Sequence, residues 1–261
     1  MCGLNSNLMK TQNMPKISAL LITYNEILHI KEVLENLSFA DEIIVVDSFS
    51  TDGTVEAIKD FPQVQLFQNP FVDFTSQRTF ALTKASFDWI LFIDADERLP
   101  AAAIAEIQAE IQKPNAHDAY WMRRKIYFKG RRLRFGGRMT DKIHRLFQKG
   151  KARYKPGRLV HEKLEVNGST GLLKNALNHY PYQSFAHYEA KRIHYAKLKA
   201  RELKAQGKKP NAVWYFLKAV YKFVRHYFLK LGIFDGLSGL VLAYLTAKYV
   251  YMRYVYFKQL G

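Results

Sequence analysis

The chain has 261 residues, 48% of them hydrophobic, so it can bury the core of at least one globular domain. Its one cysteine, Cys2, excludes a disulfide framework and a cysteine-based zinc site, and it fits a reducing compartment such as the cytoplasm. The first 100 residues carry 7 basic and 14 acidic side chains, whereas the rest carry 33 and 9. The basic part favours an anionic partner: nucleic acid, a phosphorylated substrate or an anionic membrane surface.

The first 112 residues alternate between apolar strands and helices. We expect strands over residues 17–23, 42–47, 64–67 and 89–93, and helices over 26–37, 54–59, 74–85 and 100–112. Near-continuous apolar strands between helices are typical of an α/β fold, with a mostly parallel sheet and helices on both faces. Ligands of such sheets bind beyond the carboxyl ends of the strands, so the residues that follow the strands are site candidates.

The rest of the chain has a different character. Further strands are expected over 119–128 and 140–147, followed by helices over about 185–206, 213–231 and 237–257. With a soft boundary near Pro181, the predicted organisation is a flexible N-terminus (1–15), a catalytic domain (16–180) and a helical, aromatic and basic extension (181–261).

Two segments bear on membrane targeting. The polar start of the chain, residues 1–14, lacks the apolar run of a signal peptide. The most apolar stretch, residues 231–250, is interrupted by Asp235 and Lys248. It falls short of a clean span of about 20 apolar residues, so we interpret it as interfacial or packed rather than transmembrane.

An acidic pair follows the fourth expected strand. Asp94 and Asp96 lie two residues apart, and because side chains alternate along an extended chain, both carboxylates can point to the same side. Paired carboxylates suit a divalent cation such as Mg²⁺ or Mn²⁺, which can bind a diphosphate and stabilise it as a leaving group. The alternative is a solvated acidic turn before a helix.

Four motifs occur in order: Ile22-Thr23-Tyr24-Asn25-Glu26, residues 46–54 (Val-Asp-Ser-Phe-Ser-Thr-Asp-Gly-Thr), Gln77-Arg78 and Asp94-Ala95-Asp96. Together they resemble the family 2 inverting glycosyltransferases, which have a GT-A fold, over about residues 16–112. The resemblance implies roles for eight residues: Thr23, Tyr24 and Glu26 at the base and ribose, Asp47 on the base with Asp52 nearby, Arg78 on the nucleotide, Asp94 on ribose or metal, and Asp96 on the metal.

Later motifs are similar to a narrower group. These are Gly136-Gly137, Asp141, residues 145–147, 160–162 and 179–180, and they resemble lipopolysaccharide core glycosyltransferases that add glucose to inner-core heptose. Arg138 and Met139 stand where that group usually has an aromatic residue. The resemblance implies transfer of a hexose, glucose from a UDP donor, to a lipid-linked acceptor at the cytoplasmic face of the inner membrane, with the enzyme bound peripherally there.

Inverting transfer needs a base to take the proton of the acceptor hydroxyl. The resemblance favours Glu162, with Asp141 second. Glu162 could instead belong, with Lys163 and Glu165, to an alternating solvent-facing set of residues on a strand. His161 is a candidate to orient Glu162, contact phosphate or bind the metal, although a lone histidine is more often structural.

Several alternatives remain open. The enzyme could act on another glycan or on a polyprenyl phosphate, or the chain could be a nucleotidyltransferase or a non-catalytic binding protein. The basic run at 123–138 suits an anion site, and since no nucleic-acid-binding module is present we expect no nucleic-acid partner. The aromatic and basic C-terminal helices suit an anionic membrane surface or simple packing against the catalytic domain.

Overall fold

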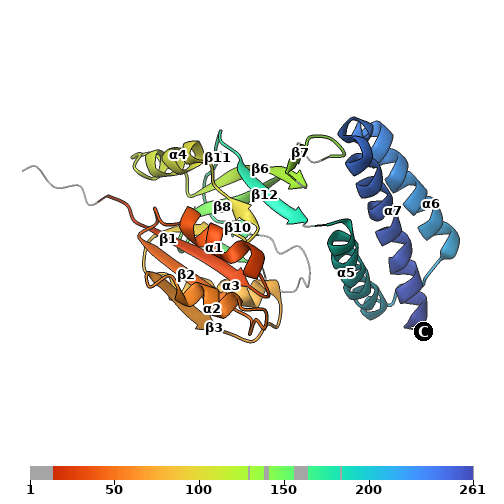
Figure 1. Cartoon of the computed structure of the whole chain (residues 1–261), viewed down its shortest axis with the longest axis horizontal. Helices are drawn as coiled ribbons and strands as arrows, with labels where there is room; N and C mark the ends of the chain where they lie inside the picture. The colour runs from red at the N-terminus through yellow and green to blue at the C-terminus, as the bar shows by residue number, and fades with distance from the viewer. Residues whose placement is uncertain (1–13, 129, 138–140, 156–163, 183, 261) are drawn as a thin grey trace, which may run out of the picture.

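The computed structural model describes residues 14–128, 130–137, 141–155, 164–182 and 184–260. Residues 1–13 of the expected N-terminal segment therefore lie outside the described residues. Figure 1 shows a mixed α/β part beside a group of three C-terminal helices. The expected fold class, a mostly parallel sheet with helices on both faces and a helical extension, is confirmed.

The N-terminal part of the sheet is parallel. Its strands are β1 (Ile17–Thr23), β2 (Glu42–Asp47), β3 (Val64–Gln68) and β4 (Trp89–Phe92), in the order β3-β2-β1-β4. The helices are α1 (Ile27–Asn36), α2 (Thr54–Lys59), α3 (Phe74–Lys84) and α4 (Ala101–Ile111). Each helix and strand begins and ends within a residue or two of the sequence expectation.

Strand β1 explains why the apolar runs are continuous. Its Ala19 and Leu21 pack into one core cluster with residues of α1 and α4, and its Leu20 packs into another with Ala81 of α3. Both faces of β1 are therefore covered by helices, and a strand buried on both faces needs apolar side chains at successive positions.

The second part of the sheet is mixed. Strand β8 (Lys142–Gln148) is antiparallel to β4, β6 (Ala119–Phe128) is antiparallel to β8, and β12 (Leu177–Tyr182) is parallel to β6. Short strands complete it: β5 (Glu97–Arg98), β7 (Arg131–Leu133), β11 (Thr170–Leu172), and the separate pair β9 (Ala152–Tyr154) and β10 (Leu164–Val166). The sequence analysis missed these strands of two or three residues, which are too short to show alternation.

The C-terminal helices are α5 (Phe185–Ala205), α6 (Ala212–Val224) and α7 (Gly236–Gln259). Helix α7 contacts both α5 and α6, and the three share an apolar core. A further cluster joins Leu242 and Leu245 of α7 to Ile126 and Phe128 of β6. The extension is therefore packed against the mixed part of the sheet.

The single helix expected over 213–231 is wrong at its end. After α6 comes a π-helical turn (Arg225–Leu229), in which Lys230 N donates to Arg225 O, and then Leu231 adopts a left-handed conformation with φ 58°. A Cβ at Gly232 would lie 2.5 Å from the His226 carbonyl oxygen, so the sharp turn that follows needs a glycine. A short 3₁₀ turn (Gly232–Asp235) then leads into α7.

By length and composition, the helical segment Gly232–Gln259 could cross a membrane. It is longer than the stretch considered in the sequence analysis, which fell short of a span. Of its most apolar window, 28% is buried inside the protein, and helix α7 lies against both other C-terminal helices. Core helices of soluble proteins share this length and composition.

Candidate active site

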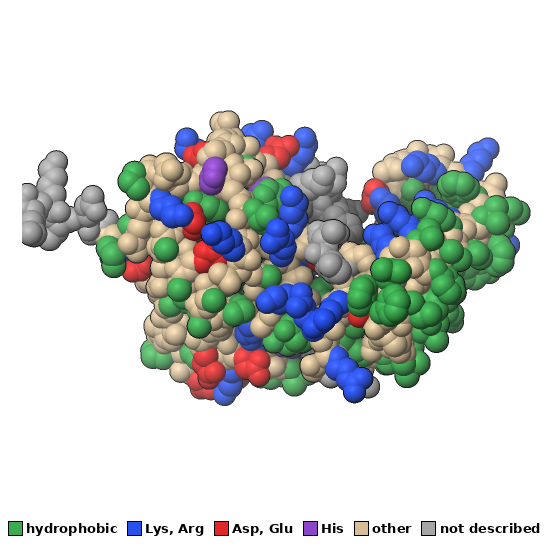
Figure 2. Space-filling model, turned by 90° about the horizontal axis from the view of Figure 1, so that it is seen from above, with side chains coloured by type: hydrophobic (Ala, Val, Ile, Leu, Met, Phe, Trp, Pro, Cys, Tyr) green, Lys and Arg blue, Asp and Glu red, His purple; other side chains and the backbone are tan. Residues whose placement is uncertain are grey.

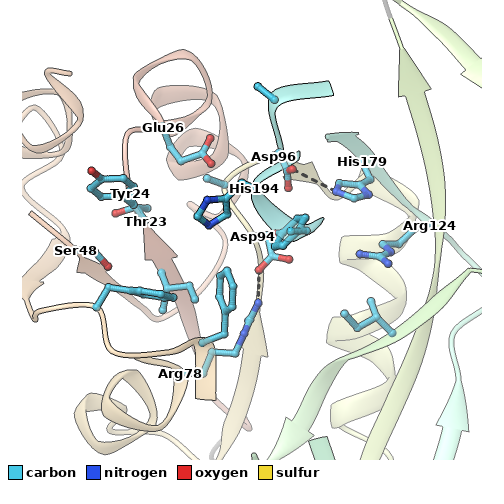
Figure 3. A pocket seen from close by; sticks show the side chains of 17 residues that line it. Thr23, Tyr24, Glu26, Ser48, Arg78, Asp94, Asp96, Arg124, His179 and His194 are labelled. Carbon is cyan, nitrogen blue, oxygen red and sulfur yellow. Dashed lines mark hydrogen bonds and ion pairs between the residues drawn. The ribbon is translucent and has the colours of Figure 1, made fainter. Parts of the chain in front are cut away.

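A cavity of about 730 Å³ opens at the carboxyl ends of β1, β2 and β4 (Figure 3). Its polar lining includes Thr23, Tyr24, Glu26, Ser48, Arg78, Asp94, Asp96, Arg124, His179 and His194. Six of the eight residues assigned to donor or metal in the sequence analysis therefore line one cavity. Parallel strands bring their carboxyl ends to one edge, which is why these separate motifs meet there.

Arginines and carboxylates alternate through the floor of the cavity. Arg78 Nη2 donates to Asp94 Oδ1 at 2.7 Å, and Arg145 pairs with the other oxygen of Asp94. Arg145 Nη2 also lies 2.7 Å from Glu97 Oε1. Arg124 Nη1 lies 3.7 Å from the same Glu97 oxygen and binds Asp141 with two hydrogen bonds. Three cations thus offset three carboxylates.

The centre of this ion-pair network is buried. Arg145 is 1% exposed and Glu97 0%. Burial alone would raise the pKa of Asp94, but the Arg145 and Arg78 guanidiniums outweigh it and hold that pKa well below its ordinary value. Burial likewise opposes the charge of Arg145, but Asp94 and Glu97 raise its pKa. Both groups stay ionised at any physiological pH.

Asp96 has a different partner. Its Oδ2 lies 3.3 Å from Nε2 of His179, which is 83 residues further along the chain. Strand β12 pairs with β5, setting His179 opposite Glu97, and Tyr180 N donates to Asp96 O at 2.8 Å. These backbone contacts fix the pair. Figure 3 shows the Asp96 carboxylate between Glu26 on one side and His179 on the other, with the dashed line joining Asp96 to His179.

The arrangement of sheet, acidic motif and cavity agrees with a comparison to known families. The model of glycosyl transferase family 2 matches residues 18–178, more than half of the chain. The chain belongs to this family. It is therefore an enzyme, a glycosyltransferase, and the matched region contains every residue that lines the cavity except His179 of β12 and the three residues of α5.

Named relatives cover nearly the whole glycosyltransferase. It is 29% identical over 251 residues to "Lipopolysaccharide core biosynthesis glycosyltransferase LpsC" of Rhizobium meliloti, covering 91% of this chain and 93% of LpsC. It is also 33% identical to an uncharacterized glycosyltransferase of Rickettsia bellii, and the match covers 85% of this chain and 80% of that protein. The structure of residues 1–349 of S. aureus TarS with UDP aligns over 94% of this chain and 91% of that one, with 17% identity and a TM-score of 0.51. The last likeness concerns the fold alone.

Two predicted nucleoside ligands of the glycosyltransferase do not line the cavity. Asp47 is fully buried, and its oxygens accept hydrogen bonds from Thr23 Oγ1 and from the backbone and hydroxyl of Ser50. Asp52 accepts from Thr54 and from Ile27 N. Both carboxylates brace the loops that carry Thr23, Tyr24 and Glu26. A direct contact of Asp47 with a base would need Ser50 to move first.

Of the three candidates for the catalytic base and its neighbour, only Asp141 is among the described residues. His161 and Glu162 lie outside the described residues. Asp141 is described: its two oxygens receive Arg124 Nε at 2.9 Å and Nη2 at 3.0 Å. A carboxylate held in this two-pronged way already serves an ion pair, which disfavours it as the acceptor of a substrate proton.

Helix α5 supplies a wall that the sequence analysis missed. Ala190, His194 and Tyr195 line the same cavity as Asp94 and Asp96. The helix follows β12 directly and packs through Tyr188 against Ile126 and Phe128 of β6, which turns this face toward the site. No local pattern distinguishes His194 from the other histidine of the helix. A signal did exist for Arg145, a charged residue directly before the apolar Leu146 and Phe147 in a strand.

Proposed function

We propose that this glycosyltransferase transfers a hexose, glucose from UDP-glucose, with inversion to a lipid-linked acceptor of the lipopolysaccharide inner-core type, with a divalent cation. The observation that carries the proposal is the cavity that joins Thr23 and Tyr24 at the end of β1 to the Asp94–Asp96 motif at the end of β4. The 29% identity to LpsC over almost the whole length of both chains supports the acceptor class.

The donor nucleotide would lie at the end of β1. Tyr24 is 60% exposed at the cavity, so its ring is open to stack on a base. Thr23 and Ser48 offer hydroxyls at the same edge. Arg78 is only 4% exposed and is held by Asp94, so it would present its charge to the nucleotide from a fixed position. TarS, which has the same fold, is solved with UDP.

Asp96 and His179 fit a cation. Two ligand atoms at right angles, each about 2.1 Å from one ion, lie about 3 Å apart, and this oxygen and nitrogen are 3.3 Å apart. Both oxygens of Asp94 face arginines, so Asp94 would act as a neighbour that orients the site. No group of three or more His, Cys, Asp or Glu residues suited to a metal is found within the described ranges, so donor phosphates and water would complete the set. When bound, the cation neutralises the departing diphosphate.

The reaction is a single displacement. The bond from the acceptor oxygen to the anomeric carbon forms as the bond to the UDP oxygen breaks, and the hydroxyl proton passes to a base. We assign that proton to Glu162, since Asp141 is engaged by Arg124. The Arg78–Asp94–Arg145 chain would keep the floor of the cavity rigid while charge moves to the diphosphate.

The test of this function compares two variants in one assay, which follows transfer from UDP-glucose to a heptose-terminated acceptor in Mn²⁺. Glu162→Gln should lower kcat by about 10²–10⁴-fold with UDP binding unchanged, because only proton removal is lost. Asp141→Asn should have the smaller effect on kcat. A reversed order would move the base to Asp141. A product with retained anomeric configuration, or no turnover of any nucleotide-sugar, would contradict the proposed function itself.

The acceptor would be reached through a membrane-facing surface. Large hydrophobic side chains are exposed on α6, on the turns that follow it and at the start of α7, here together called the apolar surface: Val213, Trp214, Phe216, Leu217, Val220, Tyr221, Val224, Phe228, Leu229, Leu231, Ile233, Phe234 and Leu237. Figure 2 shows hydrophobic side chains gathered over the helical end of the molecule, with Lys and Arg beside them. Residues 208–261 contain nine Lys and Arg and one acidic residue, Asp235, which favours an anionic lipid surface over a second copy of the chain.

Binding to vesicles tests this surface. We expect the protein to bind phosphatidylglycerol vesicles at low salt, weakly at high salt because exposed charges are screened within about 8–10 Å near physiological strength, and poorly to neutral vesicles. The double variant Phe216→Ser, Val220→Ser should bind about tenfold or more weakly, because two apolar side chains no longer enter the interface. The matched control, Leu28→Ser with Leu172→Ser, changes exposed leucines of the catalytic domain and should bind normally. A protein that ignores anionic vesicles at low salt would exclude peripheral membrane binding.

A further inference from the structure

A second cavity, of about 270 Å³, is lined chiefly by cations. Six of its nine lining residues are basic: Arg123, Arg124, Lys125, Arg132, Arg134 and Lys174. None of the nine is acidic. Arg124 also lines the catalytic cavity, so the two cavities meet at one residue of β6. We call this second cavity the basic pocket.

Strand register gathers these cations. On β6, Arg123 and Lys125 are two residues apart, so they share a face of the strand. Arg132 of β7 and Arg134, which directly follows β7, flank Leu133, which is 4% exposed and packs with Ile126 and Phe128. Burying Leu133 therefore turns both arginines to the opposite face. Because β7 pairs antiparallel with β6, with Arg132 opposite Tyr127, the two pairs of cations are brought to neighbouring strands.

The carboxylates around the basic pocket are used elsewhere. Glu106 of α4 accepts hydrogen bonds from Lys174 N at 2.7 Å and Asn175 N at 2.8 Å. Asp235 accepts from Arg134 N and Phe135 N, each at 3.0 Å. Asp141 is held by Arg124. The bonds from Glu106 and Asp235 anchor the pocket walls through the backbone.

Within the described residues, most of this charge has no ion-pair partner, since of the six cations only Arg124 pairs with carboxylates. In the described part of the chain, Arg123, Lys125 and Arg132 form no ion pair with a carboxylate, and the same is true of Arg134 and Lys174. Like charges that converge on a cavity repel, and this costs folding energy unless an anion is bound. Guanidinium groups bind both carboxylate and phosphate oxygens in two-pronged fashion. Several cations around one cavity favour the phosphate, because it carries up to two negative charges near pH 7 whereas a carboxylate carries one.

We propose that the basic pocket is a binding site for a phosphate group, separate from the donor site. Its volume of about 270 Å³ is just below that of ordinary ligand pockets, about 300–1,000 Å³, so it suits a phosphate or sugar phosphate rather than a whole nucleotide-sugar. The basic pocket meets the candidate active-site cavity at Arg124. We therefore assign the phosphate to a molecule that also reaches the active site, namely a phosphorylated acceptor saccharide. That assignment rests on the proposed function, whereas phosphate binding itself does not.

Direct binding is the primary test, with inorganic phosphate as the probe and neither donor nor acceptor present. Titration calorimetry at constant ionic strength should give saturable binding, weakened about tenfold or more in Arg132→Gln, Arg134→Gln, because charge-assisted hydrogen bonds are lost. The matched control is Arg131→Gln, an exposed arginine of β7 outside the lining, which should bind within about twofold of the parent. UDP affinity should be unchanged in both.

Two results would overturn the proposed phosphate site. One is no saturable phosphate binding by the parent protein. The other is an equal loss of phosphate affinity in Arg131→Gln and in the double variant Arg132→Gln, Arg134→Gln, here called the pair variant. Equal losses in the two variants would mean that phosphate binds to a diffuse basic surface and not to the basic pocket. Equal losses of oligonucleotide binding in the two variants would mean the same. Thermal unfolding checks that the pair variant is folded. If the pair variant does not fold, Lys174→Gln, in the exposed loop before β12, replaces it. Its phosphate affinity should likewise fall below that of Arg131→Gln.

Two further experiments decide whether the bound phosphate belongs to the acceptor or to a lipid headgroup. With a phosphorylated acceptor the pair variant should raise KM without changing kcat, and with the same acceptor after phosphatase treatment it should match the parent. Loss of phosphatidylglycerol vesicle binding with an unchanged KM would instead identify a lipid headgroup as the ligand of the same pocket. If no transferase activity is found with any acceptor but phosphate binding depends on Arg132 and Arg134, the proposed function fails and the pocket stands.

Discussion

Replacing Asp96 with asparagine is expected to lower kcat for sugar transfer by about 10²–10³-fold, the usual worth of one group that stabilises transition-state charge. Asp96 lies beyond β4, in the cavity, and its side chain is 15% exposed beside His179. The variant should therefore fold normally and should lose the gain in UDP affinity that Mn²⁺ gives. Kinetics and UDP titrations with and without Mn²⁺ measure both effects.

His179→Gln sharpens this test, because Asp96 and His179 would hold one ion between them. Residues that act as a unit are not additive, so the double variant should be little worse than either single one. Asp60→Asn, which removes an exposed carboxylate paired with Lys31, is the control and should have parental activity. Full activity in a chelator such as EDTA, or additive losses in the double variant, would contradict a shared cation.

Arg145→Met should destabilise the protein by about 3–5 kcal/mol, the cost of breaking a buried ion pair from one side. Arg145 is 1% exposed and pairs with Asp94 and with Glu97, which is 0% exposed. Without the guanidinium, two carboxylates face each other in a poorly hydrated place. Urea unfolding followed by fluorescence measures the change in the free energy of unfolding.

A matched control exists on the surface. Arg153 is 83% exposed and lies 3.5 Å from Glu165, so Arg153→Met should cost at most about 0.5 kcal/mol. Adding Glu97→Gln to Arg145→Met should recover part of the loss, because one buried charge disappears. An Arg145→Met protein within 1 kcal/mol of the parent would mean that water or a rearranged Arg124 already compensates Glu97.

Local pattern was a sound guide wherever side-chain periodicity is repeated over enough residues. The four parallel strands, their helices and β6 were predicted with ends close to those observed, because each covers a buried face that requires apolar residues at regular spacing. The position of Asp94 and Asp96 followed from the same logic, since the end of a parallel strand is where a site forms. Membership of family 2 could likewise be anticipated from motifs within the first 112 residues.

Only the tertiary structure decided what surrounds those motifs. His179 meets Asp96 because β12 pairs with β5 and β6, a register fixed by strands too short or too distant to leave a local signal. Burial of Leu133 turns Arg132 and Arg134 into the basic pocket, and the packing of Tyr188 against β6 brings His194 into the catalytic cavity. The sequence by itself determined which residues end each strand. Which side chains then face one another depends on long-range pairing and on which apolar residues find a common core.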